Sequence, residues 1–201
     1  MKTQEKPNTG DYKIPPDPPL KKEGTSRRGR VHVYTGDGKG KTTAAFGLSL
    51  RAAGAGMRVL IVQFFKPSTD PSGEKDMIRN HIRSIELLRQ DARHPYFTGG
   101  STDREAVGKS VREMFEIAKA RAGEGFGLLV LDEIIGAMNE GFIGVNEVVS
   151  FLDGRPEGLE VVLTGRDAPP ELVRRADYVT EMLKIKHPYD EGVLARKGID
   201  F

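Results

Sequence analysis

A glycine-rich stretch near the start of the chain carries the residue types of a phosphate-binding loop. It reads Thr-Gly-Asp-Gly-Lys-Gly-Lys-Thr over residues 35–42, between a strand predicted at 31–35 and a helix predicted at 41–53. The phosphate-loop pattern is G-x-x-x-x-G-K-[ST]. Gly40-Lys41-Thr42 matches the end of this pattern, whereas Thr35 stands at the position of its first glycine.

The mechanics of such a loop survive that change. Glycines let successive backbone N–H groups turn inward and form a nest for phosphate oxygens, and the following helix directs the positive end of its dipole at the same place. Lys41 would neutralise the phosphates, and the hydroxyl of Thr42 would bind Mg²⁺. The candidate nucleotide-binding residues are Gly36, Asp37, Gly38, Lys39, Gly40, Lys41, Thr42 and Thr43.

A second motif supplies the acid that a phosphate loop needs. The apolar run at 128–131 predicts a buried strand, and Asp132 and Glu133 follow directly after it. Ligands of open α/β sheets bind at the carboxyl ends of the strands. Asp132 would hold Mg²⁺ directly or through water, and Glu133 would do the same or act as a base. With Thr42, these carboxylates predict a magnesium–nucleotide site, but the two motifs leave the reaction open.

Strands and helices alternate along the chain. Strands are predicted at 31–35, 57–64, 128–131, 160–164 and 178–185, with a weaker one at 84–88; helices are predicted at 41–53, 103–122, 145–152 and 170–175. Continuous apolar runs such as 57–64 suit the middle of a parallel sheet that is covered on both faces. The sequence therefore predicts an α/β fold with a mostly parallel sheet flanked by helices, of the P-loop NTPase (RecA-like) type.

Residues 1–29 form a predicted basic, proline-rich tail ahead of a single domain at 30–201. The first 30 residues hold five of the twelve prolines and eight Lys and Arg against four Asp and Glu, a net charge of +4. Since the whole chain of 201 residues carries +2, the remainder carries −2 and is not a basic nucleic-acid platform. The tail is either a solvated leader or a lid that folds over the ligand site.

Composition excludes several function classes. With 37% hydrophobic and 30% charged residues, the chain can bury a sizeable core. It contains no cysteine, which excludes disulfides, thiolate metal sites and cysteine nucleophiles. No apolar run approaches the length of a membrane span, and the N-terminus has no apolar signal region. We expect a cytoplasmic protein with neither a membrane nor a nucleic acid as a partner.

From about residue 30 to 201 the chain resembles the P-loop ATP:corrinoid adenosyltransferases of cobalamin biosynthesis. The resemblance includes the Thr-Gly start of the loop, which is the family's own variant of the general pattern. The matching stretches keep their order and spacing, and they lie at 35–47, 51–56, 62–66, 131–133, 164–166, 176–182, 186–188 and 198–201.

The resemblance implies a reaction that the motifs alone leave open. Enzymes of this family transfer the 5′-deoxyadenosyl group of ATP to Co(I) of a reduced corrinoid, in adenosylcobalamin biosynthesis or salvage, and triphosphate leaves whole. Because Co(I) is the nucleophile, the protein would contribute positioning and stabilisation of the leaving charge. Lys41, Glu133 and Arg166 are the expected catalytic residues, and Thr42, Asp132 and Glu133 the expected Mg²⁺ ligands.

Further residues are carried over from the resemblance. Arg51 is an expected binding residue, and Phe97 matches the phenylalanine that the family places beside the corrin. Gly99 stands where the family has a tryptophan, with Tyr96 as a candidate to compensate, and Asp37 stands where many members have asparagine. The resemblance also implies a homodimer and a flavin-based reductase partner that makes Co(I).

Two other functions compete with this interpretation. One is a P-loop ATPase or small-molecule kinase that releases ADP, with Glu133 as base or water-holding residue. The other is a nucleotide-binding regulatory module whose basic tail touches an acidic partner. His187 is expected to be a structural or nucleotide-side residue, not a cobalt ligand.

Overall fold

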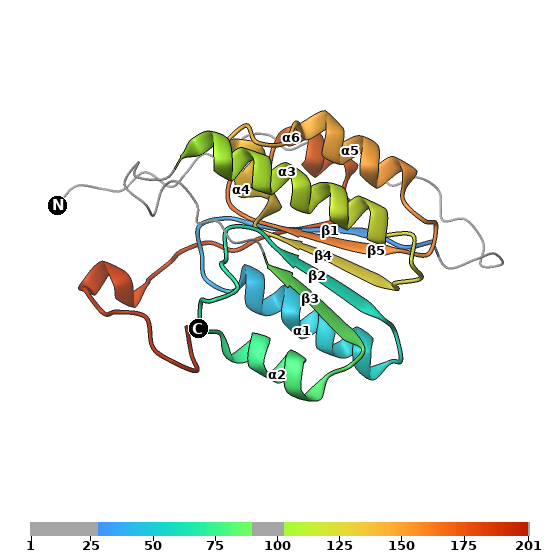
Figure 1. Cartoon of the computed structure of the whole chain (residues 1–201). Coiled ribbons are helices and arrows are strands. Elements are labelled where there is room, and N and C mark those ends of the chain that lie inside the picture. Colours follow the sequence, from blue (N-terminus) through green and yellow to red (C-terminus); the bar gives the residue numbers. More distant parts are fainter. Residues whose placement is uncertain (1–27, 90–102, 201) are drawn as a thin grey trace.

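The computed structural model describes residues 28–89 and 103–200 as an α/β fold (Figure 1). Six parallel strands form one sheet in the order β3-β2-β4-β5-β1-β6. This confirms the predicted fold class. Residues 1–27 of the predicted tail, together with Tyr96, Phe97 and Gly99, lie outside the described residues.

Strands and helices follow one another along the chain in the predicted alternation. The strands are β1 Val31–Thr35, β2 Val59–Gln63, β3 Ile85–Arg89, β4 Leu128–Asp132, β5 Glu160–Thr164 and β6 Tyr178–Glu181. The helices are α1 Lys41–Gly54, α2 Gly73–His81, α3 Arg104–Arg121, α4 Ile134–Asn139, α5 Val145–Gly154 and α6 Pro170–Arg175, followed by a 3₁₀ turn at Pro188–Glu191.

Helices cover both faces of the sheet, which explains its continuous apolar strands. Figure 1 shows α1 and α2 on one face and α3 to α6 on the other. Leu60 and Val62 of β2 pack with the larger helix group, whereas Val59 and Ile61 pack against α1 and α2. Because successive side chains of a strand point to opposite faces, a strand covered on both sides must be apolar throughout.

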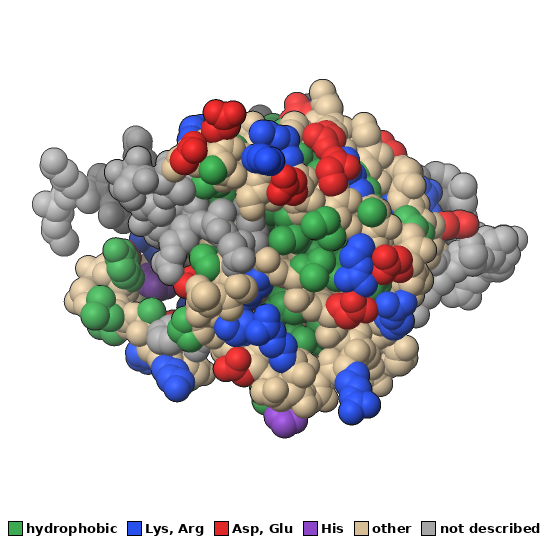
Figure 2. Space-filling view, viewed as in Figure 1, with side chains coloured by type: hydrophobic (Ala, Val, Ile, Leu, Met, Phe, Trp, Pro, Cys, Tyr) green, Lys and Arg blue, Asp and Glu red, His purple; other side chains and the backbone are tan. Residues whose placement is uncertain are grey.

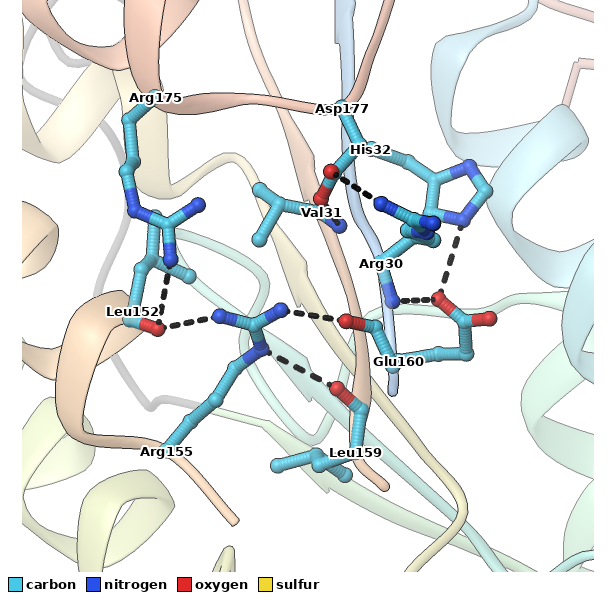
Figure 3. A network of polar contacts seen from close by, with 10 residues as sticks. Arg30, Val31, His32, Leu152, Arg155, Leu159, Glu160, Arg175 and Asp177 are labelled. Atoms are coloured by element: carbon cyan, nitrogen blue, oxygen red, sulfur yellow. Dashed lines mark hydrogen bonds and ion pairs between the residues drawn. The ribbon is translucent and has the colours of Figure 1, made fainter. Parts of the chain in front are cut away.

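A polar network fastens the amino ends of β1 and β6 (Figure 3). Arg30 forms an ion pair with Asp177 (3.0 Å), whose other oxygen accepts the N–H of Val31 (2.8 Å). Burial alone would raise the pKa of Asp177, but the Val31 N–H and the Arg30 guanidinium hold it below its usual value. Arg155 adds a bond from its Nε to the Leu159 carbonyl (3.2 Å). The first described residues therefore join the sheet at the end opposite the phosphate loop.

Local structure departs from the sequence prediction in three places. Helices α2 and α4 were not predicted, because they are nine and six residues long and too short for a clear apolar period. The strand predicted at 178–185 ends at Glu181, since Met182 turns onto the phosphate loop. None of the helices in the described ranges is long and apolar enough to cross a bilayer.

Candidate nucleotide site

The glycine-rich loop lies at the carboxyl end of β1, where the sequence predicted it. Gly36 and Gly40 take positive φ angles of 94° and 121°, and Gly40 caps α1. The structure adds a second reason for glycine here: a Cβ at Gly36 or Gly38 would come within 2.5 Å or 2.7 Å of the Met182 carbonyl oxygen. The backbone after β6 thus packs directly on the loop, and the Gly38 N–H donates to that same oxygen (2.6 Å).

Lys41 is held in the middle of the loop. Its side-chain ammonium donates to the carbonyl oxygens of Gly36 and Gly38, the second at 2.9 Å, and the residue is only 8% exposed. Burial lowers the pKa of Lys41, and the nearby Glu133 carboxylate opposes this effect. An ammonium has three N–H donors, so two bonds to the loop leave a third for a phosphate oxygen.

Asp132 serves the loop through hydrogen bonds. It is fully buried, and its Oδ1 accepts from the hydroxyls of Thr42 (2.9 Å) and Thr164 (2.7 Å). Its Oδ2 accepts from Gln63 Nε2 (2.9 Å). With both oxygens engaged inside the protein, Asp132 is arranged to orient Thr42, and this geometry favours an indirect role over direct metal ligation.

Glu133 occupies the next position in an unusual backbone conformation. Its φ is 65°, in the left-handed region, and its N–H donates to the Thr164 hydroxyl (2.9 Å). Burial raises the pKa of the Glu133 carboxyl, and the neighbouring Asp132 raises it further. The cations Lys41, Lys66 and Arg166 act in the opposite direction. Glu133 is therefore a half-buried carboxylate ringed by positive charge, which suits a group that faces a metal ion and phosphates.

Backbone strain gathers at the same edge of the sheet. The non-glycine residues with positive φ in the described part of the chain are Phe65, Glu133 and Asp167. They come shortly after the carboxyl ends of β2, β4 and β5, respectively. Each such residue costs of order 1–3 kcal/mol, and such costs collect at functional sites. The strain marks this edge independently of the sequence motifs.

Arg166 lies beside the phosphate loop. Its Nη1 is 3.9 Å from Asp37 Oδ1, and both side chains are mostly exposed, so the pair contributes little to stability. The Asn139 amide holds the turn by donating to the Arg166 carbonyl (2.9 Å). Arg166 is thus placed where the sequence expected it, and its charge offsets that of Asp37 next to the loop.

Other predicted site residues are not gathered around Lys41. Lys39 turns outward, and its Nζ contacts Asp200 Oδ1 (2.9 Å) and the Ile199 carbonyl (3.0 Å). Thr43 is exposed in the first turn of α1. Arg51 is exposed ten residues beyond Lys41, about 15 Å along α1 at 1.5 Å per residue.

Residues 182–200, which we call the C-terminal segment, close one side of the site. The segment contacts the loop at both ends, through Met182 at Gly38 and through Asp200 at Lys39. Figure 1 shows it in red, swinging out from the sheet and returning toward α1. His187 caps the 3₁₀ turn by accepting the Tyr189 N–H (3.2 Å), so the structural role expected for it is confirmed.

Sequence reasoning missed Gln63 and Thr164 as parts of this site. Both are polar residues that end an otherwise apolar strand, β2 and β5, and both are fully or almost fully buried. A polar side chain at the carboxyl end of an apolar run was the available signal, because all parallel strands present that end to the same edge. In the described residues, no three His, Cys, Asp or Glu side chains gather as a metal cluster.

Comparison with known proteins identifies the family. The model of the family described as "ATP:corrinoid adenosyltransferase BtuR/CobO/CobP" matches residues 27–201. The chain belongs to this adenosyltransferase family. The resemblance seen in the sequence is thereby confirmed, and the P-loop architecture of the site fits it.

Named members of the adenosyltransferase family match over most of the chain. The "Corrinoid adenosyltransferase" of Escherichia coli strain K12 is 37% identical over 175 residues, which cover 87% of this chain and 86% of that protein. The "Corrinoid adenosyltransferase CobA" of Salmonella typhimurium is 35% identical with the same coverage. A "Corrinoid adenosyltransferase" of Pseudomonas aeruginosa is 37% identical and covered over 84% of its length. The chain is thus an enzyme of the corrinoid adenosyltransferase type.

Proposed function

We propose that this adenosyltransferase moves the 5′-deoxyadenosyl group of ATP to Co(I) of a reduced corrinoid while the loop at residues 36–42 holds the triphosphate. A bond forms between cobalt and C5′ with the electron pair of Co(I). The C5′–O bond breaks, and its electron pair leaves with the triphosphate. The carrying observation is the Lys41 ammonium, fixed inside the loop by two carbonyls and flanked by Thr42, Glu133 and Arg166.

Positive charge around the loop would lower the barrier to this reaction. Negative charge grows on the triphosphate as the C5′–O bond breaks, and fixed cations stabilise growing charge without reorganising. Lys41 supplies one such cation inside the loop, and Arg166 supplies another at its rim beside Asp37. The side chains need provide no nucleophile, because the corrinoid brings its own.

The residues at the strand ends fit a bound Mg²⁺. This ion prefers oxygen ligands and takes one or two from the protein, with the rest from phosphates and water. The Thr42 hydroxyl and the Glu133 carboxylate supply such oxygens, and Asp132 orients Thr42 from behind. When bound, Mg²⁺ would add positive charge beside the leaving triphosphate.

The corrinoid side of the proposal rests on the resemblance. We propose that Phe97 lies beside the corrin, that Gly99 leaves part of the family's aromatic contact unfilled, and that residues 1–29 act as a lid. Arg51, Lys39 and Thr43 remain proposed binding residues. A cytoplasmic location and a flavin-based reductase that supplies Co(I) are proposed on the same ground.

An exposed apolar surface supports a homodimer. Eight of the eleven exposed large hydrophobic residues in the described chain lie between Tyr178 and Ile199. Figure 2 shows hydrophobic side chains gathered over the C-terminal segment, and β6 is an edge strand whose residues are all exposed. Unprotected edges invite pairing with another chain. Light scattering should give twice the mass of one chain, and Val179→Lys should shift it toward the monomer.

The deciding experiment follows the corrinoid and the phosphate product together. The protein is mixed with Mg-ATP and chemically reduced cob(I)alamin without oxygen, and the visible spectrum is recorded. A light-sensitive Co–C product with one triphosphate per turnover is the expected result. ADP and phosphate without a spectral change would overturn the proposal in favour of an ATPase or kinase.

A further inference from the structure

Three polar side chains line up across neighbouring strand ends behind the phosphate loop. Arg89, Gln63 and Asp132 are the last residues of β3, β2 and β4, and the register places Gln63 opposite both of the others. Arg89 Nε donates to Gln63 Oε1 (2.8 Å), and Gln63 Nε2 donates to Asp132 Oδ2 (2.9 Å). We call these three residues the strand-end relay.

Hydrogen-bond chemistry fixes the orientation of the Gln63 amide. A guanidinium only donates hydrogen bonds, and an ionised carboxylate only accepts them. Gln63 must therefore turn its oxygen toward Arg89 and its NH₂ group toward Asp132. Gln63 is 1% exposed and Asp132 is 0% exposed, so bulk water does not replace either partner. Without Arg89, the amide is free to present its oxygen to the carboxylate, where the two oxygens would repel.

Asp132 passes this order on to the loop and to the start of α4. Its Oδ1 accepts the hydroxyl protons of Thr42 (2.9 Å) and Thr164 (2.7 Å). Because Thr42 gives its O–H to Asp132, its oxygen lone pairs remain for another partner. Thr164 in turn accepts the N–H of Glu133 (2.9 Å). The relay therefore ends on the two residues that we propose as Mg²⁺ ligands.

The far end of the relay is also anchored. Arg89 Nη1 donates to the Asp70 carbonyl (3.0 Å), on the loop that precedes α2. The guanidinium is thus held from two sides and brings a positive charge near Asp132 without touching it. Figure 1 shows β3, β2 and β4 side by side at this point of the sheet.

We propose that Arg89 and Gln63 are positioning residues, which set the Thr42 hydroxyl and the Glu133 backbone for binding the metal end of Mg-ATP. The inference rests on the proposed magnesium site. In it, the two residues act only through Asp132 and contact neither substrate.

The test measures how much Mg²⁺ tightens ATP binding. ATP is titrated calorimetrically with Mg²⁺ and again with a chelator, for wild type, Arg89→Met, Gln63→Leu and the double variant. Each single variant should lose at least tenfold of the gain in affinity given by Mg²⁺, with chelator-measured affinity within threefold of wild type. The double variant should lose no more than the singles, because both residues act through Asp132. A purely structural role would lower the melting temperature and leave the Mg²⁺ gain unchanged.

A matched control lies at the opposite end of the same strands. Arg58 precedes β2 and contacts Glu86 of β3 (2.9 Å), far from Asp132 along the sheet. Arg58→Met should keep the full Mg²⁺ gain. Arg89→Lys keeps the charge but loses the planar fork of donors, and it should fall between wild type and Arg89→Met.

Two outcomes overturn the inference. One is a full Mg²⁺ gain in folded Gln63→Leu or Arg89→Lys, which also covers the case that Arg89→Met does not fold. The other is a double variant whose loss is the product of the single losses, because the residues would then act independently. Thr42→Ala separates this from the proposed function: an unchanged Mg²⁺ gain in that variant refutes the metal site itself.

Discussion

Replacing Lys41 by methionine tests the centre of the proposed site. The change removes the ammonium and keeps a stem of similar length. An ion pair at about 4 Å and an effective dielectric constant of about 20 contributes about 4 kcal/mol. Since each 1.4 kcal/mol is about tenfold in affinity, Lys41→Met should weaken ATP binding by roughly 10³-fold. Equilibrium titration with ATP at saturating Mg²⁺ measures this loss.

Lys75 offers a control for the structural part of the effect. Like Lys41 it is 8% exposed, and its ammonium donates to two backbone carbonyls, those of Ser68 (3.0 Å) and Asp70 (2.9 Å). Losing such bonds costs about 1–3 kcal/mol, so both methionine variants should melt several degrees lower. Only Lys41→Met should lose ATP. The reasoning is refuted if Lys41→Met binds ATP within tenfold of wild type, or if Lys75→Met loses as much affinity.

Three further changes probe the rest of the site. Because burial raises the folded-state pKa of Glu133, folding stability should fall as pH rises from the ordinary carboxyl pKa through that raised value, so Glu133→Gln should melt higher than wild type at pH 7 while Mg²⁺ no longer tightens ATP binding; a lower melting temperature would contradict this. Gly36→Ala should lower the melting temperature by roughly 4–8 °C, about 2 kcal/mol, since its Cβ meets the Met182 backbone at 2.5 Å; an unchanged thermal scan would count against it. Asp200→Asn weakens the contact with Lys39 and should speed tryptic cleavage of the C-terminal segment, and equal cleavage rates would show that the contact does not hold the segment.

The chemistry-bearing part of the site could be predicted from local sequence. Glycines at 36 and 40 do take positive φ angles, Lys41 and Thr42 do begin a helix, and Asp132 does end a buried strand. These features depend on backbone preferences and on apolar runs within a few residues of each other, which a sequence displays directly. The family resemblance added the reaction, which such patterns leave open.

The directions of the side chains could not be predicted in this way. Sequence analysis treated Asp132 as a metal ligand, yet the structure turns it toward Thr42, 90 residues away. It grouped Lys39 with the loop, yet Lys39 reaches the carbonyl of Ile199, 160 residues away. A side chain between two surroundings takes the partner that folding brings near, and no local pattern records that partner.

The sequence by itself determined the fold class, the phosphate loop, its acidic strand end and the family. Only the tertiary structure decided which oxygens of the acidic pair face inward, and which strand ends stand side by side. It joined Arg89 to Gln63 and Gln63 to Asp132, residues of three strands that become neighbours through the sheet order. The physical reason is that strand formation follows local apolar content, whereas pairing order and register arise when the whole sheet buries both faces beneath its helices.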